Sequence, residues 1–380
     1  MMSDVIVIGG GLAGTALTYE LARAGASVLL LEKGRLAGEA SGASMGMALW
    51  IGMATDAELA QAVEGFQRLP QLPAELEADL HYRRLPSLVL APNEAIFVKL
   101  RHQAERFQQV GLPARMVDLA EIVELEPALD PAEMIGALYA EQDHLDGTAL
   151  TRAYADAAQR LGATVREFAP VRDFVVPNDR VTAVETDREH IPAGQVVLAA
   201  GAWTRRLAAL VGADLPVYHL HGQAVSTVPL PARLNGMVMV ARPDGYSGLE
   251  RWVATSLAAG GSWEEWLDDT AAVDTSLVQL RDGRVLLGQF SRALPAQQLS
   301  LQPEAVEQIQ SGAVQLVPAL AGVPLQRSWI APVSFTASQA PLLGAVPGYR
   351  NLFVCAGFKS ILLTAPVLCK KLAQEILATV

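Results

Sequence analysis

The chain is poor in cysteine and in basic residues. It has 380 residues and only two cysteines, Cys355 and Cys369. Neither a disulfide framework nor a thiolate metal site is therefore expected, which fits a reducing compartment. Its 29 Lys and Arg residues stand against 40 Asp and Glu residues, for a net charge of −11. Because nucleic-acid backbones are bound by clustered basic side chains, the composition disfavours a nucleic-acid partner.

Long uninterrupted hydrophobic runs are also scarce. Residues 5–31 are mostly apolar, but Glu20 and Arg23 interrupt them and no basic segment precedes them, which argues against a membrane span or a signal peptide. An apolar share of 51% over this length favours two packed domains rather than a disordered chain. We therefore expect a soluble, cytoplasmic protein.

The order of apolar segments predicts the fold class. Residues 5–8 are a buried parallel strand by composition, residues 13–24 an amphipathic helix and residues 27–31 a second strand, which together form a βαβ unit. Residues 196–199 and 352–355 are further apolar strands, whereas residues 216–300 alternate short strands with Pro and Gly turns. We predict an α/β protein with a doubly wound, Rossmann-like dinucleotide-binding domain built from non-contiguous segments. A mainly antiparallel β substrate domain with helices completes it. The expected boundaries assign residues 1–85, 140–215 and 325–380 to the first domain, and residues 86–139 and 216–324 to the second.

A G-x-G-x-x-G motif lies between the first strand and the first helix. Gly9 permits a tight turn, Gly11 lets the backbone approach a pyrophosphate, and Gly14 lets the helix pack closely on the strand. Glu32 ends the second strand, where a carboxylate can bind a ribose diol and repel a 2′-phosphate. The motif predicts a dinucleotide site but does not choose FAD over NAD.

Three later segments bear on that choice. Residues 40–47 (ASGASMGM), 197–204 (VLAAGAWT) and 357–366 (GFKSILLTAP) follow the glycine motif in order. The whole arrangement resembles the D-amino-acid oxidase family of FAD enzymes, in its glycine oxidase and sarcosine oxidase-like branch. The resemblance implies FAD and a substrate domain that covers the isoalloxazine. It also implies non-covalent FAD, because residues 329–336 lack the cysteine that relatives use for covalent attachment.

The resemblance carries over a set of cofactor-binding residues. Most are small residues or backbone donors, and Lys359 is the cation expected nearest to reduced flavin, with a solvated surface lysine as the alternative. The expected FAD contacts are Gly9, Gly11, Leu12, Ala13, Gly14, Glu32, Lys33, Ala40, Ser41, Ser44, Met45, Gly46, Met47, Val171, Ala200, Gly201, Trp203, Gly357, Lys359, Ser360, Ile361 and Leu362.

The substrate side departs from the family. Val333 stands where relatives carry the arginine that pairs the substrate carboxylate, and Ser276 where they carry a pocket tyrosine. An apolar side chain cannot replace a bidentate guanidinium–carboxylate pair. Either another arginine, such as Arg242, Arg251 or Arg327, supplies the carboxylate contact, or the substrate is not a simple α-amino acid. The candidates for the substrate pocket are Met47, Leu49, Trp50, Ser276, Val333 and Lys359, with core packing as the alternative for the apolar ones.

Two histidines, His219 and His221, share one face of an expected strand. Without a third ligand nearby they do not make a metal site, and we predict no metal; a structural hydrogen bond is the expected role of His221. No catalytic side chain is singled out, because the chemistry would be centred on the flavin.

The predicted function is FAD-dependent oxidation of a C–N bond. In this family a hydride passes from the carbon next to nitrogen to flavin N5, and the imine formed then hydrolyses. The predicted partners are an amine or amino-acid-like small molecule and O₂ or another electron acceptor; a homo- or hetero-oligomer stays open. The alternatives are a flavin dehydrogenase that reduces a quinone or a protein, a non-catalytic flavoprotein subunit, and an NAD-binding Rossmann enzyme.

Overall fold

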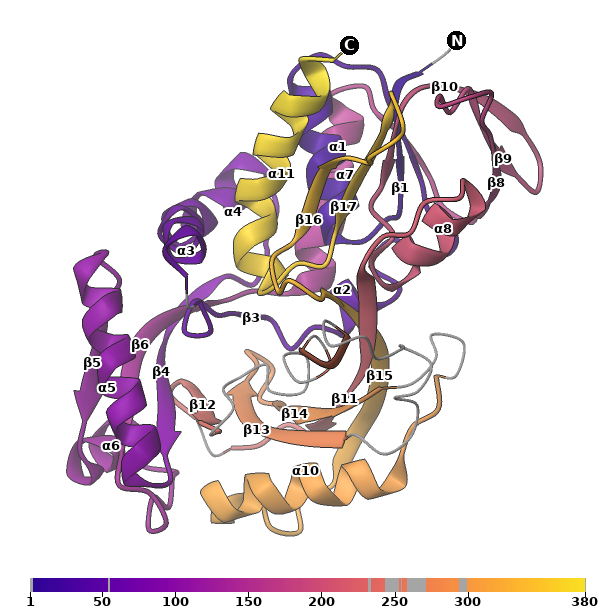
Figure 1. Ribbon diagram of the computed structural model, residues 1–380. Helices are drawn as coiled ribbons and strands as arrows, with labels where there is room; N and C mark the ends of the chain where they lie inside the picture. Colours follow the sequence, from indigo (N-terminus) through magenta and orange to yellow (C-terminus); the bar gives the residue numbers. More distant parts are fainter. Residues whose placement is uncertain are drawn as a thin grey trace.

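The computed structural model describes residues 3–53, 55–231, 234–242, 253, 255–257, 271–293 and 299–379. Within this part of the chain, two large β-sheets lie one above the other in Figure 1, each with its own helices. The upper sheet contains β1 and the lower sheet contains β11, β13 and β14.

The first sheet is mostly parallel and has eight strands. Its path is β16 (Leu342–Ala345), β17 (Leu352–Ala356), β10 (His190–Leu198), β1 (Ser3–Ile8), β2 (Val28–Leu31) and β7 (Thr164–Arg166), with β8 (Val171–Val175) and β9 (Ala183–Thr186) paired off this path. The pairs from β17 to β7 are parallel, and β16 is antiparallel to β17. The chain leaves β1 toward β2 on one side and reaches β10 on the other, which is the doubly wound order predicted from the sequence.

Helices cover both faces of this sheet, as its wholly apolar strands predict. Val5 and Val7 pack into the cluster that includes α1 (Leu12–Arg23), α7 (Gly147–Arg160) and α11 (Ile361–Leu377). Ile6 and Ile8 point to the other face, toward α8 (Thr204–Leu210). The alternation follows from the two-residue repeat of a strand, and it buries all four side chains.

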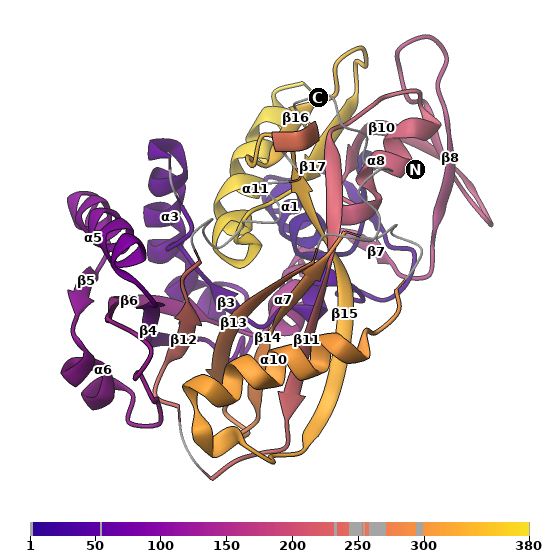
Figure 2. The same ribbon diagram turned by 60° about the horizontal axis from the view of Figure 1, so that its bottom comes forward.

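The second sheet is mostly antiparallel and has nine strands. Its path is β15 (Leu325–Thr336), β11 (Val217–Thr227), β14 (Val285–Arg292), β13 (Ala271–Gln279), β12 (Met237–Val240), β4 (Arg83–Ala91), β6 (Gly136–His144) and β3 (Met47–Ala48), with β5 (Ala114–Val117) paired to β6. In Figure 2, α10 (Pro303–Leu316) crosses in front of β11, β13 and β14. On the other side of the molecule, α5 (Glu94–Gln109) and α6 (Leu119–Leu125) pack on β4, β5 and β6.

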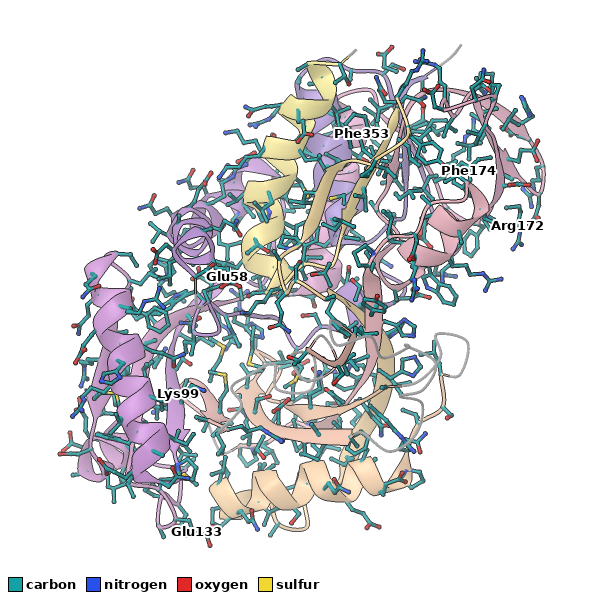
Figure 3. All side chains as sticks on the ribbon, viewed as in Figure 1. Glu58, Lys99, Glu133, Arg172, Phe174 and Phe353 are labelled. Atoms are coloured by element: carbon teal, nitrogen blue, oxygen red, sulfur yellow. The ribbon has the colours of Figure 1, made fainter. Side chains whose placement is uncertain are left out.

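Three shorter or peripheral helices link the sheets: α2 (Ala40–Ala43), α3 (Asp56–Arg68) and α4 (Leu72–Glu75). A capping box starts α3, because the Thr55 hydroxyl accepts from the Glu58 amide and the Glu58 carboxylate accepts from the Thr55 amide. Further along, a Cβ on Gly65 would lie 2.5 Å from the Leu363 carbonyl oxygen of α11, so the two helices pack closely there. Figure 3 shows Glu58 at the start of α3, on the side of α11.

The sheet pairing divides the chain differently from the expected boundaries. The boundaries at 85/86 and 139/140 cut through β4 and β6, which pair over their whole length in the second sheet. Residues 325–336 were expected in the first domain, but as β15 they pair with β11 in the second sheet. Hydrogen-bond pairing between strands distant in sequence decides membership of a sheet, and composition alone does not reveal it.

No helix in the described part of the chain is long and apolar enough to cross a membrane.

Candidate functional site

A cavity of about 390 Å³ lies at the carboxyl ends of the parallel strands. Its walls come from the ends of β1, β2, β10 and β17, from the loop before α2 and from β15 of the second sheet. Ligands of open α/β sheets bind at this edge, beside the strand where the order reverses. The cavity is therefore the candidate cofactor site.

The glycine motif forms a turn that admits no side chains at two positions. Gly9 has φ +119°, and a Cβ there would lie 2.4 Å from the Ala199 carbonyl oxygen. A Cβ on Gly14 would lie only 1.9 Å from the Gly9 carbonyl oxygen. The first glycine thus permits the turn, and the third lets α1 approach β1, as the sequence predicts.

The N-terminus of α1 lies at this cavity, which Gly11, Leu12 and Ala13 line. Gly11 is the N-cap and has no side chain to satisfy the first turn. The Ser41 hydroxyl accepts from the Leu12 amide at 2.9 Å. Because the dipole at a helix N-terminus favours negative charge, this end of α1 suits a phosphate, with Ser41 beside it.

Glu32 is fixed at the end of β2. Its two carboxylate oxygens accept from the Gly10 amide and the Gly34 amide, each at 2.7 Å. The carboxylate is thus anchored to the glycine turn while it lines the cavity. A carboxylate held in this place can accept hydrogen bonds from a ribose diol.

Lys33, Glu39 and Trp203 form a small cluster on the cavity wall. The Lys33 ammonium lies 3.7 Å from the centre of the Trp203 ring, and both side chains donate to the Glu39 carboxylate, at 2.6 and 2.7 Å. The cluster ties the loop after β2 to the turn after β10, the two segments that frame one side of the cavity.

Most of the expected cofactor residues meet in this cavity. Those that line it are Gly9, Gly11, Leu12, Ala13, Glu32, Lys33, Ala40, Ser41, Val171, Ala200, Gly201, Trp203, Gly357 and Ile361. The others lie outside its lining: Gly14, Ser44, Met45, Gly46, Met47, Lys359, Ser360 and Leu362. Ser44, Met45 and Gly46 line a second cavity instead. Ser360 adopts a left-handed conformation and donates to the Leu49 carbonyl at 2.5 Å, which fixes the start of α11.

Sequence analysis missed several lining residues, among them Pro170, Arg172, Arg206, Pro332 and Ser334. Pro170 and Arg172 flank Val171, so the signal for them was their adjacency to a predicted contact. Pro332 and Ser334 lie on β15, and only the three-dimensional placement of the second sheet brings them to the cavity. Figure 3 shows Arg172 at the β8 edge of the first sheet, with Phe353 deep in that sheet.

The substrate-pocket candidates do not all meet. Trp50 is fully buried and packs edge-on against Phe66 and Phe107, with ring centroids 6.2 and 4.9 Å away. Its side chain belongs to the core, which is the alternative given for it above. Met47 and Leu49 are partly buried beside the cluster that holds Met45. The buried Ser276 hydroxyl donates to the Gly288 carbonyl at 2.9 Å, next to the Met45 sulfur at 4.0 Å.

Val333 and Lys359 both lie beside cavity-lining residues. Val333 is half-buried on β15 between Pro332 and Ser334, opposite Leu220 of β11. Lys359 follows the lining residues Gly357 and Phe358 and forms an ion pair with Glu58, with a nitrogen–oxygen distance of 3.1 Å. Both side chains of this pair are more than four-fifths buried, at 17% and 16% exposure.

The three alternative arginines lie in different places. Arg242 donates to the Val273 carbonyl at 2.6 Å and lies 3.7 Å from the Asp274 carboxylate. Arg327 lines the second cavity, and Arg251 falls outside the described residues.

His221 does not make the hydrogen bond expected of it. Its ring is almost fully buried, and neither ring nitrogen has a hydrogen-bond partner among the described residues. Burial, together with nearby His219, lowers the pKa of His221 to about 4. The two rings stack with centroids 5.6 Å apart. In the described part of the chain no group of three metal-ligating side chains exists.

The residues around the first cavity fit FAD. A Cβ on Gly9 would collide with the Ala199 carbonyl, small residues at 40–41 at the start of α2 line the cavity, and the Glu32 carboxylate lies at the end of β2, where a ribose would bind. These features define a dinucleotide-binding oxidoreductase of Rossmann type.

Comparison with known proteins gives the family. A family model described as FAD dependent oxidoreductase matches residues 4–375, and the chain therefore belongs to this family. It is 27% identical to glycine oxidase of Geobacillus kaustophilus over 96% of this chain and 90% of that protein. The glycine oxidase structure from Bacillus cereus superposes with a TM-score of 0.83 at 25% identity, covering 99% of this chain and 98% of the other.

Longer relatives match as well. The mitochondrial pyruvate dehydrogenase phosphatase regulatory subunit of Mus musculus is 24% identical over 94% of this chain. This chain spans 38–43% of the length of the first curated relatives that it matches. The resemblance to the D-amino-acid oxidase family, the fold class and the FAD cofactor predicted from the sequence are confirmed.

Proposed function

We propose that the chain oxidises the carbon–nitrogen bond of an amine or amino-acid-like substrate. The observation that carries the proposal is the cavity where the glycine turn, Glu32, the start of α2 at 40–41 and the turn at Gly357 meet. FAD bound there supplies the acceptor for a hydride from the carbon next to the substrate nitrogen. The substrate becomes an imine, which water hydrolyses to a carbonyl and an amine or ammonia.

The chain contributes orientation and exclusion of water to this chemistry. The N-terminus of α1 would face the diphosphate, and the Glu32 carboxylate would accept from the ribose. The second sheet covers the cavity through Pro332 and Ser334 of β15. No strong side-chain base is required if the amine binds in its neutral form.

We further propose that Lys359 binds the carboxylate of an amino-acid substrate. Val333 offers only an isopropyl group where relatives carry arginine, so the charge must come from another residue. Lys359 lies next to the cavity lining, and Glu58 holds its ammonium in place at 3.1 Å. A substrate carboxylate would share this ammonium with Glu58.

A second candidate is a flavoprotein subunit without activity of its own. Val333 favours it, and so does the match to a relative whose name describes a regulatory subunit. A dehydrogenase that reduces a quinone or a protein is distinguished from an oxidase by slow reoxidation of reduced flavin in air.

The first test is anaerobic bleaching of the FAD absorbance of the purified protein. Glycine, sarcosine, proline and D-alanine would each be compared with the amine that lacks the carboxylate: methylamine, dimethylamine, pyrrolidine and ethylamine. Bleaching by any of these compounds supports C–N oxidation. If none of them bleaches a flavin that dithionite reduces normally, the proposed activity is refuted and the non-catalytic subunit is favoured.

Lys359→Met tests the carboxylate contact. Loss of a charge-assisted bond is expected to raise the concentration of amino acid needed for half-maximal bleaching by about tenfold or more. The matched amine should be unaffected. Lys371→Met is the control, because Lys371 lies on the exposed side of the same helix and pairs with Glu64. Equal effects on amino acid and amine would contradict the assignment.

A further inference from the structure

A second cavity of about 300 Å³ lies on the other side of the segment 42–46. It is bounded by the β13–β14 turn, the start of β4, the start of α7 and β15, and it shares no lining residue with the FAD cavity. The proposed oxidation does not use it.

Positive charge gathers in this cavity although the chain as a whole carries a net charge of −11. Four arginines line it: Arg83, Arg281, Arg284 and Arg327. The two acidic residues in the lining are Asp146 and Asp282, and Asp146 accepts from the Ala149 amide as the N-cap of α7. Asp282 pairs with Arg284 at 2.7 Å, and Arg281 lies 3.6 Å from Asp79.

Arg83 and Arg327 have no such counter-charge. Arg83 is half-buried and donates to the Gln279 carbonyl at 2.7 Å, and its buried Nε has no hydrogen-bond partner within the described ranges. The guanidinium of Arg327 lies 5.4 Å from the centre of the Trp329 ring. Among the described residues, no carboxylate lies within ion-pair distance of either guanidinium. Two cations directed into one cavity without acidic partners are the arrangement that binds an oxyanion.

A buried acceptor completes the lining. His144 is 3% exposed, and its Nε2 lies 3.2 Å from the Met45 carbonyl oxygen, so that nitrogen carries the proton. Its Nδ1 is then a buried acceptor with no hydrogen-bond partner in the part of the chain that the structure describes. Burial, with a smaller contribution from Arg83, lowers the pKa of His144 to about 4, which keeps the ring neutral. The neutral ring therefore adds no charge to the cavity.

We infer that this second cavity binds the phosphate or carboxylate group of a small organic anion through Arg83 and Arg327. Trp329, whose indole N–H donates to the Ala43 carbonyl at 2.8 Å, forms an apolar wall beside the oxyanion. The inference goes beyond the proposed oxidation and does not depend on it.

Calorimetric titration of the FAD-saturated protein tests the inference. The probes are inorganic phosphate and citrate, with chloride at matched ionic strength as the reference. The variants are Arg83→Gln and Arg327→Gln, and the control is Arg101→Gln, on the exposed face of α5. Arg327 is exposed, so its substitution does not disturb the core even if that of Arg83 impairs folding.

One phosphate or citrate is expected to bind per chain, with affinity lowered about tenfold or more in both variants and unchanged in the control. Binding of phosphate alone identifies a phosphorylated ligand, and binding of citrate alone identifies a carboxylate. The inference is overturned if neither probe binds, or if Arg101→Gln weakens binding as much. Binding that FAD saturation abolishes would place the anion in the first cavity and overturn the inference too.

Discussion

Replacing Gly14 by alanine tests whether the close approach of α1 to β1 creates the FAD site. The new Cβ would lie 1.9 Å from the Gly9 carbonyl oxygen, whereas real Cβ atoms stay beyond 3.0 Å, so the backbone must move by at least 1.1 Å. The obstacle is backbone on a tight turn, so a side-chain rotation cannot relieve the clash. Overpacking of this kind costs about 1–3 kcal/mol. Because the same turn lines the cavity, FAD must reverse this displacement in order to bind, and we expect its affinity to fall by about 5- to 150-fold.

Gly34→Ala is the matched control. Gly34 lies near the same turn, but the nearest atom to its added Cβ would be a Glu32 carboxylate oxygen at 3.7 Å, an ordinary contact. Quenching of flavin fluorescence on titration into the apoprotein gives both dissociation constants. Should Gly14→Ala bind FAD as tightly as Gly34→Ala does, the cavity at the glycine turn is not the FAD site and the reasoning fails.

Two further predictions concern stability. The lowered pKa of His144 means that the folded chain favours the neutral ring. Its stabilising effect is full above the unfolded pKa of 6.5 and is lost as the pH falls toward about 4. When the pH is lowered from about 8 to about 5, this histidine should lower the unfolding free energy by about 2 kcal/mol. Urea unfolding should show a smaller loss in His144→Gln and the full loss in the exposed control His102→Gln. If the unfolding free energy of His144→Gln depends on pH as steeply as that of the unsubstituted chain, the prediction is refuted. Separately, Arg68 forms an ion pair with Glu75 and lies 3.7 Å from the buried Glu20. Arg68→Met leaves both carboxylates under-compensated and should lower the unfolding free energy by about 3 kcal/mol, whereas a loss below about 0.5 kcal/mol would contradict this.

The cofactor-binding residues could be predicted because the cofactor site requires small residues at particular positions. A turn with no room for a Cβ atom at Gly9 and Gly14 requires glycine there. The start of α2 lies against the cavity and requires small residues such as Ala40 and Ser41. Such requirements act over short stretches of chain. They appear in the sequence as patterns with fixed spacing, and the strand–turn–helix context confirms them.

The substrate side and the second cavity could not be predicted in the same way. Trp50 looked like a pocket residue because it follows a methionine-rich loop, yet Phe66 and Phe107 enclose it from α3 and α5. Arg83 and Arg327 are distant in sequence and carry no local signature. Only the pairing of β4 with β6, and of β15 with β11, brings them to one cavity. Which side chains meet across a sheet depends on the register of the strands, and a single sequence does not reveal that register.

Residues of the segment 40–46 line both cavities, and hydrogen bonds connect this segment to α1 and to β15. Ser41 accepts from the Leu12 amide of α1, and the Ala43 carbonyl accepts from Trp329 of β15. Ala40 and Ser41 face the FAD cavity, and Ser44 and Gly46 face the second cavity. Because closely packed backbone transmits displacements, a ligand in one cavity that shifts the segment 40–46 alters the contacts that this segment makes in the other cavity. Coupling between two sites is reciprocal. An anion in the second cavity that changes the affinity for FAD must therefore have its own affinity changed by FAD by the same factor.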